Sequence, residues 1–166
     1  MNKLDSFHMM IVSQYLTSIE DFVNLEFFHN NPIPLTTKTI KFFDNLETLN
    51  VWNKHEETFG NDLLNEKKPI SQATFNFFKI NVWFEVDYKM YKTSENDKVC
   101  YKNIVYTIND VLTFGEDIPL NVKKLGIGAF KQTERVEFNI PNNVIALDEL
   151  CFNGIDKLSQ ITFSKN

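Results

Sequence analysis

Few residues in this sequence have the types and spacing that a catalytic, metal-binding or cofactor-binding site requires. The three histidines, His8, His29 and His55, are dispersed, and none belongs to an HExxH pair or another pattern typical of metal ligands. His55 precedes Glu56 but lacks a second histidine four positions later, so a solvated polar loop explains it. The sequence contains no P-loop, no dinucleotide-binding glycine motif and no nucleophile elbow. We therefore predict no catalytic residue, no metal site and no cofactor, and we interpret the protein as a non-enzyme.

The two cysteines indicate a reducing environment. Cys100 and Cys151 form no CxxC pair and are flanked by apolar residues, which favours buried, reduced thiols over a disulfide. The chain contains no N-x-Ser/Thr sequon, no apolar stretch of membrane-spanning length and no pattern typical of a signal peptide. From these features we expect a cytoplasmic protein without integral membrane association.

Charge and composition exclude further classes. With 166 residues, of which 43% are hydrophobic and 23% charged, the chain is typical of a globular protein rather than a disordered or collagen-like one. Its 22 acidic residues outnumber its 17 basic residues, for a formal net charge of −5, and Arg135 is its single arginine. Nucleic-acid binding needs a basic surface, so we expect no nucleic-acid partner.

The N-terminal part of the chain has the apolar spacing of short helices. Between residues 4 and 46, candidate caps at Ser6, Ser18 and Thr36 or Thr37 each precede apolar residues at helical intervals. This pattern predicts a helical leader over residues 1–79.

A central β element is predicted over residues 80–115. Residues 80–88 alternate between apolar and polar side chains, which indicates a strand, and residues 99–107 form a second apolar run. The two runs make a hairpin plausible. Asn109 can cap a single helical turn that Gly115 ends.

The C-terminal part contains a repeat. Residues 118–130 match residues 140–152 at an offset of 22, with Ile, Pro, Val, Leu and Phe at coinciding positions. Each copy is followed by an alternating strand, residues 138–140 in the first and 161–163 in the second. A period of this length with one strand per unit is typical of a solenoid.

The repeat makes a family resemblance visible. The pattern I-P-x-x-V-x-x-L-x-x-x-(small)-F, followed by L-x-x-I-x-F, resembles the BspA-type leucine-rich repeat. Residues 4–34 and 103–119 are similar to the segments that precede these repeats in BspA-like proteins of amoebic parasites. The chain has only two repeats where such proteins carry many. The resemblance implies a protein–protein interaction module with a protein partner that it does not identify.

A second interpretation is an F-box, a helical module that docks on a ubiquitin-ligase adaptor and often precedes leucine-rich repeats that select substrates. The residues that resemble it are Leu4, Val12, Tyr15, Leu16, Asp21, Phe22, Leu25 and Phe28. Asp5 stands where that module has proline, and Phe7 where it has an acidic residue. A helical cap on the repeats explains the same residues.

Together these features predict an α+β fold. It has a helical N-terminal part, a central β element over residues 80–115, and a short right-handed leucine-rich-repeat solenoid with parallel strands over residues 116–166. The predicted inward row of the solenoid is Ile118, Val122, Leu125, Phe130, Phe138, Ile140, Val144, Leu147, Phe152, Leu158, Ile161 and Phe163.

Two surfaces of the repeats are candidates for binding. Because side chains alternate along a strand, the outward positions Glu137, Asn139, Gln160 and Thr162 form a predicted partner-binding strand face. The last strand contains Ile161 and Phe163 and is followed by only three residues, so we expect an open edge there. The simplest partner for that edge is the same edge of a second copy, in a homodimer.

Overall fold

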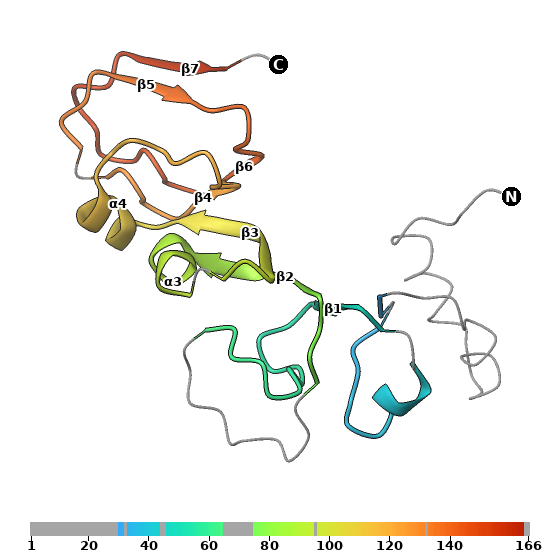
Figure 1. Cartoon of the computed structure of the whole chain (residues 1–166). Helices are drawn as coiled ribbons and strands as arrows, with labels where there is room; N and C mark the ends of the chain where they lie inside the picture. The colour runs from blue at the N-terminus through green and yellow to red at the C-terminus, as the bar shows by residue number, and fades with distance from the viewer. Residues whose placement is uncertain are drawn as a thin grey trace, which may run out of the picture. The chain divides into compact units, whose positions relative to one another are not determined.

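The computed structural model describes residues 30–31, 33–43, 46–64, 75–94, 96–131 and 133–164 (Figure 1). In chain order its elements are η1 (Ile40–Phe42), β1 (Thr48–Val51), β2 (Lys79–Asp87), α3 (Tyr88–Thr93), β3 (Val99–Tyr106), α4 (Ile108–Phe114), β4 (Lys124–Leu125), β5 (Glu137–Ile140), β6 (Ala146–Leu147) and β7 (Gln160–Phe163). One sheet has the strand order β1-β2-β3-β4-β6, and the second contains β5 and β7. The chain divides into two compact units, residues 1–84 with 96–100, and residues 85–95 with 101–166.

In the first unit, asparagine side chains link neighbouring strands. β1 pairs in parallel with β2, which places Asn50 beside Asn81. The fully buried Asn31 side chain accepts from the amide of Asn50 at 2.6 Å and donates to its carbonyl at 2.9 Å. The side-chain oxygen of Asn50 in turn accepts from Asn81 and from the indole of Trp83, at 3.0 and 3.1 Å. These bonds offset the cost of burying amide groups in a strand.

The connection between β2 and β3 differs from the predicted hairpin. β2 has the expected alternation, with Ile80, Val82 and Val86 buried. It ends at Asp87, whose carboxylate accepts from the amide of Met90 at 2.6 Å and so begins helix α3. The amide of Ile80 donates to the carbonyl of Lys98, so the two neighbouring strands begin side by side. The hairpin prediction was wrong because a capped helix provides a crossover where a turn was expected.

In the second unit, the Asp110 carboxylate joins two helices. It accepts from the amide and hydroxyl of Thr107, at 2.8 and 2.7 Å, in a capping box that begins α4. It also accepts from the amides of Tyr88 and Lys89 in the first turn of α3, at 3.3 and 2.8 Å. Asp110 is 1% exposed. One buried carboxylate therefore satisfies donors at the beginnings of both helices.

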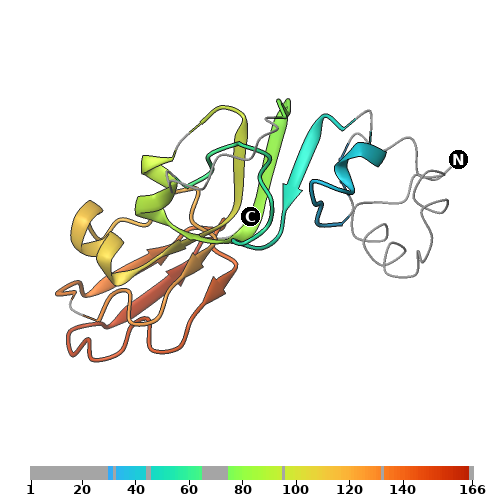
Figure 2. The same cartoon turned by 90° about the horizontal axis from the view of Figure 1, so that it is seen from below.

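The sequence repeat corresponds to parallel strand pairing in the second unit. β4 pairs with β6 through Lys124–Ala146 and Leu125–Leu147, an offset of 22 residues. β5 pairs with β7 from Glu137–Gln160 to Ile140–Phe163, an offset of 23 residues. Each repeat contributes one short strand to each of two sheets, and Figures 1 and 2 show β5 and β7 side by side.

The predicted fold class was wrong. Within the described residues, helical structure is limited to two short helices, α3 and α4, and the single turn η1, while most strands lie in a mainly parallel sheet. The proposed leader helices before residue 30 lie outside the described residues. After residue 33, the apolar spacing that predicted a helix yields only η1, and the chain then enters β1, which pairs with the distant β2. Tertiary pairing overrides local helical spacing here.

The predicted solenoid with one strand per repeat is corrected in the same way, because each repeat has two strands. Its predicted inward row divides into three groups. Val122, Leu125, Phe130, Phe138 and Ile140 are buried; Ile118, Val144, Phe152 and Leu158 are partly buried; Leu147, Ile161 and Phe163 are exposed. The first repeat thus has a closed core, and the second leaves much of its apolar row uncovered.

Replacing Asp110 tests its role as the shared cap. Asp110→Ala is expected to lower the free energy of unfolding by roughly 3–5 kcal/mol, because it leaves several buried donors without an acceptor. Asp110→Asn retains one acceptor oxygen and is expected to cost less. Chemical denaturation measures both, with Asp97→Ala as the control at an exposed carboxylate. A loss below about 1 kcal/mol for Asp110→Ala would contradict the assignment.

Candidate functional site

The predicted strand face is assembled as a small polar array on the sheet formed by β5 and β7. The parallel register places Glu137 beside Gln160 and Asn139 beside Thr162, and all four side chains are exposed. The Thr162 hydroxyl donates to the carbonyl of Phe138 at 3.2 Å, and the Ser164 hydroxyl donates to the side-chain oxygen of Asn139 at 3.1 Å. The array carries a single charge, from Glu137, and offers amide and hydroxyl groups to a partner.

β7 also carries exposed apolar side chains, and it lies at the end of its sheet among the described strands. β6 lies at the end of the other sheet in the same way. We use the name open edge for these two strands and their exposed apolar neighbours, which are Ile145, Leu147, Leu150, Ile161 and Phe163. Both strands thus present exposed apolar side chains, which are a common feature of interaction sites.

Equivalent positions of the two repeats show how this edge arises. Ile140 is 1% exposed, whereas Phe163, which pairs with it in register, is 63% exposed. Leu125 is fully buried, whereas its equivalent Leu147 is 42% exposed. Both members of each pair are apolar, but their covering differs: the second repeat covers the first, and no described residue covers the second to the same extent.

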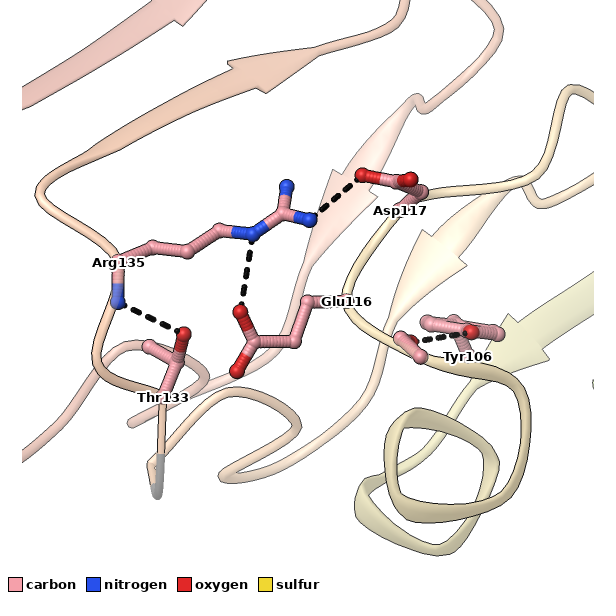
Figure 3. A network of polar contacts seen from close by, with 6 residues as sticks. Tyr106, Glu116, Asp117, Thr133 and Arg135 are labelled. Carbon is pink, nitrogen blue, oxygen red and sulfur yellow. Dashed lines mark hydrogen bonds and ion pairs between the residues drawn. The ribbon is translucent and has the colours of Figure 1, made fainter.

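Basic residues at equivalent positions of the two repeats form ion pairs, although their acidic partners occupy different positions. Arg135 contacts Glu116 through Nε at 2.9 Å and Asp117 through a terminal nitrogen at 2.7 Å (Figure 3). Lys157, 22 positions after Arg135, pairs with Glu134, and this cation lowers the pKa of the Glu134 carboxyl. Each basic residue therefore contacts an acidic residue from the preceding part of the chain.

A third ion-pair system joins the strands of the larger sheet. The Lys124 ammonium lies 2.9 Å from a carboxylate oxygen of Glu85 and 3.0 Å from one of Asp148. Its hydrogen bond to Glu85 raises the pKa of Lys124 most, and its hydrogen bond to Asp148 raises it further. A basic side chain thus again connects acidic residues of neighbouring segments.

The turn after β4 and its counterpart in the second repeat both need a left-handed backbone. Gly128 has φ of 60°, and Leu150, its equivalent 22 positions later, has φ of 59°. Glycine adopts this conformation freely, whereas leucine pays a steric penalty. Leu150 is also 61% exposed, so burial of its side chain does little to offset the strain. Alignment of the repeats could have identified this residue from the sequence.

Two buried groups have altered acidity but face no reaction partner. The Tyr106 side chain is fully buried, and its hydroxyl donates to the carbonyl of Gly115 at 2.7 Å (Figure 3). Burial, followed by the nearby Asp110 carboxylate, raises the pKa of Tyr106 to about 12. Burial also raises the pKa of the Cys151 thiol, which favours its unreactive protonated form. Both groups belong to the packed interior.

Among the described residues, no side-chain cluster has the composition of a metal site. They contain no group of three or more His, Cys, Asp or Glu side chains that could hold a metal ion. Cys100 and Cys151 are free thiols. His8 and His29, and the residues from Leu4 to Phe28 that resemble an F-box, lie outside the described part of the chain. Across the described ranges, no helix has the length and apolar character needed to cross a membrane.

Comparisons with known proteins add no family. No family model, no curated protein and no solved structure gives a significant match to this chain.

The two equivalent turns predict opposite changes in stability when glycine is removed from the first and introduced into the second. Gly128→Ala is expected to cost about 1 kcal/mol, because the added Cβ meets only the end of the Lys131 side chain at 3.5 Å and the penalty is conformational. Leu150→Gly relieves the same conformation and is expected to leave stability unchanged or raise it by up to about 1 kcal/mol. Denaturant titration measures both. Leu120→Gly, at an exposed leucine without positive φ, is the matched control and should be destabilising. Destabilisation by Leu150→Gly as large as in the control would refute this explanation.

The phenol of Tyr106 predicts a loss of stability at high pH. Its pKa is about 12 in the folded chain and about 10 when unfolded, so folding favours the protonated form. The stabilisation is complete below pH ~10 and is lost as the pH rises toward 12. Phenolate absorbance, recorded for the wild type and for Tyr106→Phe, gives the titration of this residue by difference. A midpoint near the ordinary tyrosine value would show that the hydroxyl is not held as described.

Proposed function

We propose that the protein is a non-enzymatic protein–protein interaction module. The observation that carries the proposal is the contrast between equivalent apolar positions, which are buried in the first repeat and exposed along the open edge in the second. An exposed apolar row beside unpaired strand backbone is a common way for a protein to bind an extended segment of another.

The resemblance to BspA-type leucine-rich-repeat proteins supports the same class of function. This resemblance rests on the repeat motif alone, because the comparisons with known proteins gave no significant match. The F-box alternative has no observation in its favour among the described residues.

The polar array on β5 and β7 is the second proposed binding surface. Glu137, Asn139, Gln160 and Thr162 adjoin the open edge through β7, so one partner can contact both surfaces. A homodimer through Ile161 and Phe163 is the simplest assembly that uses the edge alone.

Affinity capture from native cells, with quantitative mass spectrometry, tests the proposal with three variants. Ile161→Lys/Phe163→Lys places charge on the open edge and is expected to reduce recovery of specific partners at least tenfold. Glu137→Arg/Thr162→Arg tests the polar array. Leu112→Lys, at an exposed apolar residue of α4, is the control and should leave the partners unchanged.

Circular dichroism establishes that each variant is folded, and light scattering measures its oligomeric state. Partners that are the same for the wild type and for both surface variants would contradict the interaction proposal. A wild-type monomer at tens of micromolar would exclude the homodimer without affecting binding to other proteins.

A further inference from the structure

The first repeat shows which chemistry covers an edge of this kind. The carbonyls of Lys123 and Leu125 accept from the amides of Ile145 and Asp148, each at 2.8 Å. In the smaller sheet, the carbonyl of Ile140 accepts from the amide of Ser164 at 2.9 Å. The layer that closes the first repeat is thus an extended, parallel segment that donates backbone amides and places alternate apolar side chains inward.

The same acceptors recur at the open edge. The carbonyl of Val136 accepts from the amide of Ser159 at 2.8 Å, and Ser159 occupies the equivalent position one repeat later. Phe163 is likewise equivalent to Ile140. Because β7 ends its sheet among the described strands, the carbonyls of Ser159 and Phe163 are placed to receive amides from one further parallel strand.

The charged residues of the second repeat indicate the charge that a partner segment should carry. Lys157 of the second repeat pairs with Glu134, and the equivalent of Glu134 is Asp156, 22 positions later. Asp156 is exposed, and no described residue forms an ion pair with it. A segment that covers β7 as the second repeat covers β5 would place its equivalent of Lys157 beside Asp156, so this position favours a basic residue.

The same charges argue against a second copy as the occupant. A two-fold interface places the same patch on both sides, so the exposed Asp156 and Glu149 of each copy would be brought to one interface. Like charges brought together oppose association, and the net charge of −5 adds to the repulsion.

We propose that the open edge binds an extended basic–apolar segment of a partner protein, added as a strand parallel to β7. Such a segment has a Lys or Arg three or four residues before two alternate apolar residues, as Arg135 precedes Phe138 and Ile140 and as Lys157 precedes Ile161 and Phe163. The basic residue pairs with Asp156, the two apolar residues cover Ile161 and Phe163, and backbone amides reach the carbonyls of β7. This inference rests on the proposed function and names the chemistry of its partner.

A synthetic peptide with the sequence of Gly154–Ser164 is the probe, because this segment already covers the first repeat. Titration into the isotope-labelled full chain, followed by NMR, is expected to shift signals of β6 and β7. Lys157→Glu in the peptide, or Asp156→Lys in the protein, is expected to weaken binding by roughly tenfold, and higher salt should weaken binding by the wild-type pair.

Charge exchange provides the decisive comparison. The Lys157→Glu peptide should regain affinity for the Asp156→Lys protein, which a general loss of structure would not allow. Asp97→Lys changes the net charge equally at an exposed residue of the first unit and should bind the wild-type peptide almost normally.

Four results would overturn the inference. The first three are no binding of the peptide, binding that is indifferent to the charge exchange, and shifts dominated by β5, which would mean that the peptide displaces β7. A wild-type dimer that Ile161→Lys abolishes and the peptide cannot disrupt would identify a second copy as the occupant and also overturn it. If cellular partners depend on Ile161 and Phe163 while the peptide fails, the proposed function stands and the basic–apolar segment is wrong.

Discussion

The second unit depends on one buried carboxylate. Asp110 closes the capping box of α4 with Thr107 and also accepts from the first amides of α3, so the strand-to-helix corner after β3 has one defined geometry. That corner positions Tyr106, whose carbonyl accepts from the amide of Gly126 next to β4. The pairing of β4, and then of β6 upon β4, follows from a backbone that this carboxylate holds in place.

After this corner, each segment of the repeats provides partners for the backbone, apolar and charged groups of the segment before it. Backbone amides, apolar side chains and basic residues of a later segment meet carbonyls, apolar side chains and acidic residues of an earlier one, as the Arg135 and Lys157 ion pairs illustrate. An architecture of this kind transfers its unsatisfied groups to its last layer. The open edge arises because no described segment covers the second repeat as the second repeat covers the first. The proposed partner would make the same contacts with the second repeat that the second repeat makes with the first.

Local features were predictable because their causes lie within a few residues along the chain. The alternation of β2, the strand near residues 99–107 and the short helix ended by Gly115 lie close to the expected positions. The cap of that helix is Thr107 rather than Asn109, because the reciprocal bonds of Thr107 and Asp110 define an earlier beginning. The helical leader after residue 33 and the hairpin were wrong, since both depended on partners that local spacing does not specify.

By itself, the sequence determined the repeat offsets, the alternation that places Glu137, Asn139, Gln160 and Thr162 outward, and the apolar character of Ile161 and Phe163. These depend on residue type and spacing alone. Only the tertiary structure decided that the repeats divide between two sheets, that Asp110 is shared by two helices, and that Asp156 is left unpaired among the described residues. Parallel pairing and ion pairing join residues about 20 or more positions apart, and their energies depend on which distant groups the fold brings within a few ångströms.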